Sequence, residues 1–95
     1  YIEHFFFDCL LVKPLWNIII RDIRLYLNIP IKLNHIMVLL GVTNLPNVNK
    51  KQLKIINGII AIGKLTISKF KYGKRRSIFE IYEYECELRN YWTNV

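Results

Sequence analysis

The segment from Asn49 to Tyr72 has the longest helical pattern in the chain, and it constrains the fold more than any other feature. Asn49 is a good helix N-cap, and Gln52 stands three residues later in the position of a capping box. The apolar positions at helical spacing are Leu53, Ile56, Ile60, Ile67 and Phe70, and Ile55, Ile59 and Ile62 widen this face almost all the way round. A helix that is apolar on nearly every side must be buried against more than one neighbour. The segment therefore predicts the central helix of a small bundle.

Two glycines interrupt this helical pattern, and a third follows it. Gly58 and Gly63 each cost about 1 kcal/mol of helix propensity relative to alanine, so we expect them to mark close packing of a neighbouring helix. Gly73 is expected to end the helix in the left-handed conformation.

A second helix is predicted from Pro14 to about Asn28. Proline suits the first turn of a helix because its missing N–H would have no partner there. The apolar residues that follow at helical spacing are Trp16, Ile20, Ile23 and Leu27. Ile29 precedes Pro30 and is therefore disfavoured in the α conformation, so the helix should end before it.

A third helix is predicted from Ser77 to about Trp92, with Ser77 and Glu80 in capping-box positions. Its expected apolar stripe consists of Ile81, Tyr84, Leu88 and Tyr91. Glu80, Glu83 and Glu87 are expected to lie on a solvated helix face, and helical spacing separates Glu85 from these three.

The stretch between the first two helices is less regular. Residues 34–40 fit a short helix or a strand, and Gly41, Asn44, Pro46 and Asn47 predict a loop after them. The predicted fold is mainly α: one domain over residues 1–95, forming a small three- to four-helix bundle with one short helix or strand near residues 34–40. A chain that begins with Tyr1 rather than Met is expected to be a fragment of a longer polypeptide.

The net charge of +7 is unevenly distributed along the chain. Residues 50–76 contain nine lysines and arginines and no acid, whereas residues 77–95 are net acidic. Such a concentration of positive charge attracts polyanions, of which nucleic acid is the commonest inside cells. The predicted nucleic-acid-binding residues are Lys69, Lys71, Lys74, Arg75 and Arg76 for phosphate, with Tyr72 to stack on a base. The alternative is a solvated helix end whose lysines favour the helix dipole.

His4 and Cys9 have the spacing of the second half of a zinc knuckle. A structural zinc site needs four ligands, and no Cys-x-x-Cys precedes these two residues. Residues 1–9 are therefore expected to be the trailing half of a zinc-knuckle-like segment that holds no metal, and no cofactor is expected.

Catalytic and membrane-spanning patterns are both missing from the sequence. There is no Tyr-x-Asp-Asp, no glycine-rich phosphate loop and no Gly-x-Ser-x-Gly, and Asp8 and Asp22 are the only aspartates. The longest apolar run, residues 55–63, is interrupted by Asn57 and is far shorter than the roughly 20 residues of a membrane span. We expect a chain with no catalysis of its own and no membrane partner, located inside the cell.

Several stretches resemble the region after the polymerase domain in non-LTR, LINE-type retrotransposon polyproteins. His4, Cys9 and Trp16 match the trailing half of the zinc-knuckle-like pattern of that family and the tryptophan that follows it. Leu39–Gly41, the lysine-rich apolar stretch Ile59–Lys71 and the acidic helix Phe79–Tyr91 are similar to later parts of the same region. The leading Cys-x-x-Cys of the family pattern is absent, so the knuckle is incomplete.

The resemblance implies a parent with endonuclease and RNA-directed DNA polymerase activities. The matching region would lie outside both catalytic domains, and it would assist the binding of RNA or DNA beside the rest of the polyprotein. It would be found in the nucleus or cytoplasm as part of a ribonucleoprotein. The alternative is a helical interaction module that docks on a larger polypeptide through Trp16, Trp92 and the run Phe5–Phe7, or a remnant without function.

Overall fold

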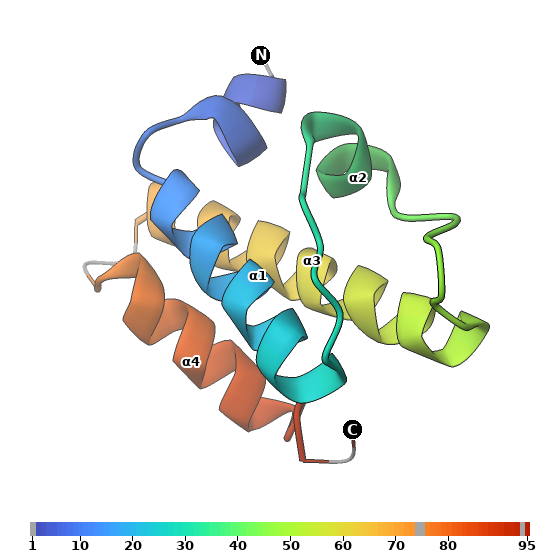
Figure 1. Ribbon diagram of the computed structural model, residues 1–95. Helices are drawn as coiled ribbons and strands as arrows, with labels where there is room; N and C mark the ends of the chain where they lie inside the picture. Colours follow the sequence, from blue (N-terminus) through green and yellow to red (C-terminus); the bar gives the residue numbers. More distant parts are fainter. Residues whose placement is uncertain (1, 74–75, 94) are drawn as a thin grey trace.

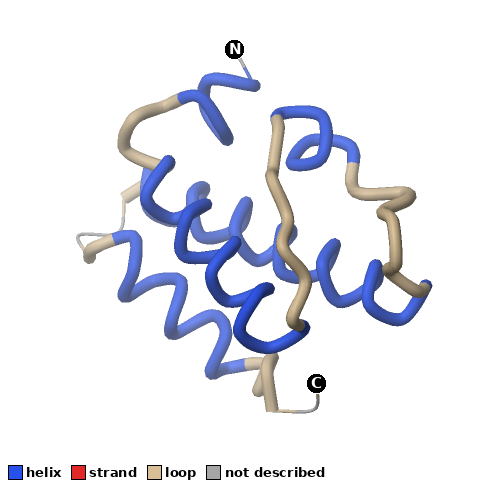
Figure 2. Tube along the Cα trace, viewed as in Figure 1, coloured by secondary structure: helices blue, strands red, loops and turns tan. Residues whose placement is uncertain are grey.

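The computed structural model describes residues 2–73, 76–93 and 95 of the chain. In these residues there are five helical segments and no strand: the π-helix η1 (His4–Asp8) and the α-helices α1 (Lys13–Leu27), α2 (His35–Leu40), α3 (Lys50–Lys71) and α4 (Ile78–Leu88) (Figures 1 and 2). The predicted small helical bundle is confirmed, and the element near residues 34–40 is a helix. None of the described helices has the length and apolar character needed to cross a membrane.

The three long helices form the core of the bundle. α3 packs against both α4 and α1, and α1 also contacts α4. η1 and α2 contact each other near the N-terminal end of α1, on the side of the molecule away from α4 (Figure 1). The central position predicted for the Asn49–Tyr72 segment is confirmed.

α1 begins and ends close to the predicted residues. Pro14 lies in the first turn, and Asn28 adopts the left-handed conformation with φ 57° while its N–H donates to the carbonyl of Arg24. Trp16 is buried, with 3% of its surface exposed, and its Nε1 donates to the carbonyl of Phe6 at 2.6 Å. Trp16 is therefore a core residue, and its predicted role as an exposed interface residue is wrong.

α3 has the predicted capping box and the predicted close packing at its glycines. The Gln52 N–H donates to Asn49 Oδ1 at 2.8 Å, and the Asn49 N–H donates to Gln52 Oε1 at 3.0 Å. A Cβ atom at Gly63 would lie 2.7 Å from Ile19 Cδ1, and a Cβ atom at Gly58 would overlap the hydroxyl of Tyr91. α1 and the Tyr91 side chain therefore approach α3 closely at two positions where α3 has no side chain.

The end of α3 differs from the prediction. Tyr72 is the C-cap residue, and Gly73 has φ +126° rather than the value of about +57° of the left-handed helical conformation. Gly73 is thus suited to its backbone angle, but it does not form the predicted left-handed cap.

α4 is shorter than predicted, and it buries a different face from the predicted one. It ends at Leu88, because Asn90 has φ 47° and the next two residues fold back onto the bundle. There the Tyr91 hydroxyl donates to the carbonyl of Ile55, and Trp92 stacks on Tyr26 with ring centroids 4.7 Å apart.

The buried side of α4 consists of Ile78, Ile81, Tyr82 and Glu85. Two residues of the predicted apolar stripe are exposed instead, Tyr84 by 51% and Leu88 by 60%. The Tyr82 hydroxyl donates to Asp22 Oδ2 on α1 at 2.7 Å. This hydrogen bond and the ion pairs of Glu85 with Lys69 and Arg89 hold one face of α4 against the bundle. Hydrophobic spacing alone did not identify that face.

Candidate nucleic-acid interface

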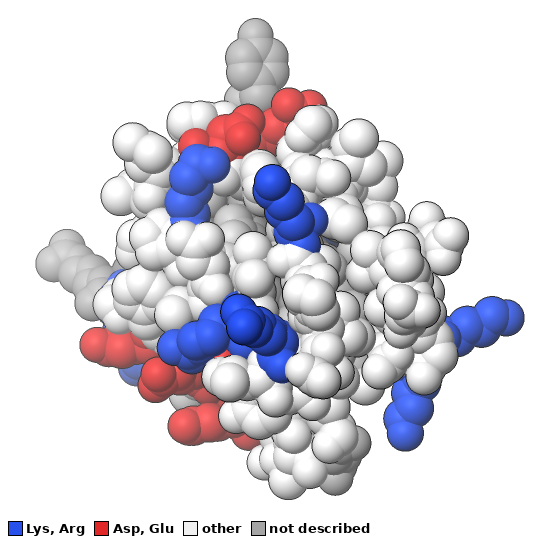
Figure 3. Space-filling view, viewed as in Figure 1, with Lys and Arg blue, Asp and Glu red and all other residues white. Residues whose placement is uncertain are grey.

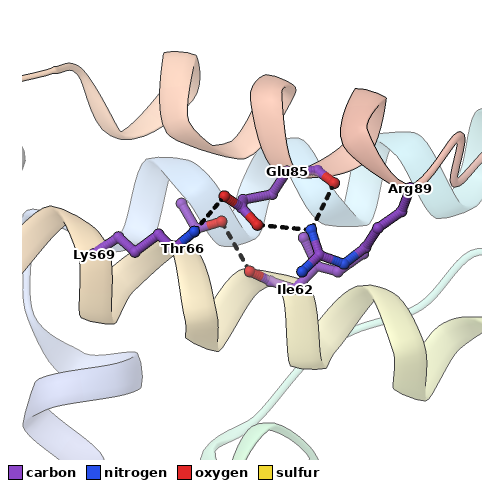
Figure 4. A network of polar contacts seen from close by, with 5 residues as sticks. All are labelled: Ile62, Thr66, Lys69, Glu85 and Arg89. Atoms are coloured by element: carbon purple, nitrogen blue, oxygen red, sulfur yellow. Dashed lines mark hydrogen bonds and ion pairs between the residues drawn. The ribbon is translucent and has the colours of Figure 1, made fainter.

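Lys69, the first residue of the predicted phosphate-binding set, lies in a network of ion pairs between α3 and α4 (Figure 4). Its Nζ donates to Glu85 Oε2 at 2.6 Å, and Arg89 Nη1 donates to Glu85 Oε1 at 2.6 Å and to the Glu85 carbonyl at 3.0 Å. Only 1% of Glu85 is exposed. The other three acids of α4 are exposed, as predicted for its solvated face, and Glu85 lies apart from them.

The protonation of Glu85 follows from its partners. Burial by itself raises the pKa of this carboxyl, but the hydrogen bonds and positive charges of Lys69 and Arg89 together lower the pKa below its ordinary value. Glu85 is therefore ionised at neutral pH and neutralises much of the charge of Lys69. In this place Lys69 joins two helices, and its pairing with Glu85 makes it a weaker candidate for a phosphate ligand than an unpaired lysine.

Lys71 holds η1 against the end of α3. Its Nζ donates to the carbonyl of Phe5 at 2.9 Å and lies 4.4 Å from the centroid of the Phe5 ring. The peptide carbonyls of a short helix lack partners within it, and here Lys71 and Trp16 supply two donors, to Phe5 and Phe6. Lys71 thus has a structural role like that of Lys69.

The other predicted site residues have different surroundings. Tyr72 is 80% exposed, and Arg76 is also exposed. Lys74 and Arg75 lie outside the described residues. The C-terminal end of α3 therefore offers an exposed aromatic ring and an exposed guanidinium, beside two lysines that already have partners.

The available lysines lie at the other end of α3. Lys50, Lys51 and Lys54 are exposed, and no ion pair to them is formed within residues 2–73, 76–93 and 95. Lys50 and Lys51 occupy the first turn, where the positive end of the helix dipole disfavours cations. These lysines belong to the basic stretch of residues 50–76 but not to the predicted site.

Helical spacing places two of these lysines, Lys50 and Lys54, in line with Tyr72. Lys54 and Tyr72 are 18 residues apart, which is five turns at about 3.6 residues per turn, so they lie on one side of the helix. Ala61 and Ser68 follow Lys54 at intervals of seven residues on the same side. We call this outward line the α3 ridge, and it consists of Lys50, Lys54, Ala61, Ser68 and Tyr72. The polar positions at this spacing are the signal in the sequence that could have identified the ridge.

Acidic side chains gather elsewhere on the surface. The exposed acids are Glu80, Glu83 and Glu87 on α4 and Glu3 and Asp8 beside η1. In Figure 3 the acids form two groups, at the lower left and at the top. The charged side chains that project at the right, where α3 begins in Figure 1, are all basic. The beginning of α3 is thus a positive surface separated from the acidic surface of α4.

The candidate metal ligands His4 and Cys9 lie in different surroundings. His4 is exposed whereas Cys9 is buried in the core, and the described part of the chain has no group of three His, Cys, Asp or Glu side chains that could hold a metal ion. Burial raises the pKa of the Cys86 thiol to about 11, so this thiol is almost fully protonated at neutral pH.

Comparisons with models of protein families, with curated proteins and with solved structures found no match to this chain. The resemblance carried by His4, Cys9 and Trp16 therefore stays a prediction.

Proposed function

We propose that this chain is a non-catalytic nucleic-acid-binding segment that holds the phosphate backbone along the outward face of α3. The observation that carries this proposal is the set of exposed lysines Lys50, Lys51 and Lys54, which have no carboxylate partner among the described residues. Two of them lie in the first turn, where each cation destabilises the helix by about 0.3–1 kcal/mol. Because these positions oppose helix stability, a role in binding anions is the better explanation for them.

The length of α3 suits an extended polyanion. At about 1.5 Å per residue, Lys54 and Tyr72 are about 27 Å apart along the axis. One strand of a nucleic acid in B-form geometry carries a charge about every 3.4 Å, so several consecutive phosphates would lie along the ridge. Arg76, exposed beyond its end, would extend this positive surface.

The proposed context is the retroelement polyprotein suggested by the sequence. The chain would act as an accessory region of a LINE-type reverse transcriptase, beside the polymerase domain and within a nuclear or cytoplasmic ribonucleoprotein. RNA or DNA and the rest of the polyprotein would be its partners. Polymerisation would be carried out by other domains of that parent.

A salt titration tests the proposal. Fluorescence anisotropy of a labelled strand of about 12 nucleotides would be measured between roughly 50 and 200 mM salt, with wild type and with the triple variant K50Q/K51Q/K54Q. We expect the triple variant to bind roughly 100-fold more weakly at the lower salt concentration, because three phosphate contacts no longer release counterions. Wild type that binds weakly and without dependence on salt would contradict the proposal.

A matched control separates local from overall charge. The triple variant K13Q/R24Q/K32Q removes the same net charge from three exposed side chains that lie outside α3. It should reduce affinity much less than the α3 variant. An equal loss in both variants would show that only net charge matters.

A second function is favoured by one feature of the surface. Leu10, Leu11, Ile36 and Leu40 are large, exposed aliphatic residues in α2 or just after η1, two elements that contact each other. An exposed apolar surface is typical of a protein-interaction site, so this end of the molecule is a candidate for docking on a larger polypeptide. Sedimentation of wild type and of L10S/L40S would test this second function. Concentration-dependent self-association of wild type that the variant abolishes would support a docking role for this apolar surface.

A further inference from the structure

We propose that a pocket at the C-terminal end of the α3 ridge binds one unpaired base of a single-stranded nucleic acid, stacked on Tyr72. The pocket has a volume of about 490 Å³ and is lined by Ile2, Phe5, Phe6, Ser68 and Tyr72. This volume lies within the range of about 300–1,000 Å³ that is common for small-molecule sites. The inference rests on the proposed function and names the form of nucleic acid that the same surface binds.

The walls of the pocket suit the flat face of a base. Tyr72 is 80% exposed, and its ring centroid lies 5.7 Å from that of Phe5 with an angle of 35° between the ring planes. Phe5 and Phe6 meet edge to face, with centroids 4.7 Å apart. Every base has an aromatic face, so stacking on such side chains binds strands with little dependence on sequence.

Contacts below the surface hold these walls in place. The hydrogen bond from Lys71 to Phe5 attaches η1 to α3, and the hydrogen bond from Trp16 to Phe6 attaches η1 to α1. Since Trp16 is itself buried in the core, the two phenylalanines are anchored to the rigid part of the bundle. An aromatic wall that is fixed before binding loses little conformational freedom when a base stacks on it.

The position of the pocket connects it to the lysines. Ser68 and Tyr72 belong to the α3 ridge, so a strand whose phosphates contact Lys50 and Lys54 would reach the pocket as it continues along the helix. A base in a duplex would first have to leave its stack, which costs a few kcal/mol. The pocket therefore favours a single strand over a duplex.

The experiment compares three DNA ligands and one RNA strand, each with three variants. The DNA ligands are a single strand of about 12 nucleotides, the same strand with all bases removed, and the duplex. The variants are Y72A, Y72F and Y84A, the last being a control because Tyr84 is an exposed tyrosine on α4, outside the pocket. A matching RNA strand is included to show whether the effect depends on the sugar.

We expect Y72A to weaken binding of the base-bearing strand by roughly 5- to 150-fold, as is usual for the loss of one stacking contact. Y72F and Y84A should bind like wild type, and Y72A should not change binding to the abasic strand or to the duplex. Because the pocket would contact the base, the loss should be similar for RNA and DNA.

Other outcomes would overturn the inference in distinguishable ways. If Y72A binds every nucleic acid as wild type does, or loses the same affinity for the abasic strand, the pocket does not bind a base. The proposed function would still stand if K50Q/K51Q/K54Q weakens binding in that case. Wild type that binds none of these nucleic acids would overturn both the base-binding pocket and the proposed function.

Discussion

Lysines lie in both halves of α3, and those near its two ends have opposite surroundings, while Lys64 lies between them and is half-buried. In the first half Lys50, Lys51 and Lys54 are exposed and form no ion pair with the described residues. In the second half Lys69 is paired with a buried carboxylate, and Lys71 donates to a backbone carbonyl of η1. The density of positive charge in a sequence therefore does not reveal how much of that charge is available to a ligand.

The helix dipole affects the lysines at the two ends of α3 in opposite directions. Lysines in the last turn of a helix are stabilised by the negative end of the dipole, whereas lysines in the first turn are destabilised. Lys69 and Lys71 therefore contribute to the stability of the bundle in two ways, through the dipole and through their partners. Lys50 and Lys51 oppose it.

The largest expected effect on stability is that of Lys69→Met. It removes one of the two cations that neutralise buried Glu85, and loss of a hydrogen bond to a charged group costs about 1.5–3 kcal/mol. Chemical denaturation should show a decrease of this size in the free energy of unfolding. Lys54→Met is the matched control and should change stability by less than about 0.5 kcal/mol. Equal effects of the two variants would remove the distinction between the halves of α3.

A second prediction concerns the dependence of stability on pH. The folded state lowers the pKa of Glu85, so the group stabilises the fold above its unfolded pKa of about 4.3, and this stabilisation is lost as the pH falls through the lower, folded pKa. Thermal unfolding between neutral and acidic pH should show a smaller loss of stability on acidification in Glu85→Gln than in wild type. The same acid dependence in both proteins would mean that Glu85 is not held ionised by Lys69 and Arg89.

The smallest expected effect has the opposite sign. The double variant K50Q/K51Q removes two cations from the first turn of α3, and each removal should stabilise the fold by about 0.3–1 kcal/mol at low salt. Differential scanning calorimetry would detect this as a small increase in Tm that decreases at high salt. A decrease in Tm would indicate that these lysines, like Lys69, make contacts that hold the bundle together.

The sequence predicted the helices well because their limits depend on local interactions. The capping box at Asn49 and the end of α1 before Pro30 follow from contacts within a few residues. The buried face of α4 was harder to predict. Tyr82 and Glu85 are buried there because they find hydrogen-bond partners 60 and 16 positions away along the chain. Polar residues that find such distant partners cannot be distinguished from solvated residues by spacing.

The candidate site was predicted only in part for the same reason. Tyr72 and Arg76 are exposed as a binding site requires, but the contacts of Lys69 with Glu85 and of Lys71 with Phe5 depend on how α4 and η1 pack. Tyr91 and Trp92 likewise leave the helical pattern because their rings have partners on α3 and α1. Local patterns thus identified where cations are concentrated, and tertiary packing determined which of them are available.

The decisive measurement is the salt dependence of single-strand binding, compared between variants at the two ends of α3. It shows which lysines contact phosphate. The slope of the logarithm of the binding constant against the logarithm of the salt concentration changes by roughly 0.7 for each phosphate contact that is removed from a single strand. We predict that K50Q/K51Q/K54Q makes the slope shallower by roughly 2, and that K69M/K71M leaves the slope unchanged while it lowers the stability of the fold. A slope that changes in K69M/K71M but not in K50Q/K51Q/K54Q would contradict the account.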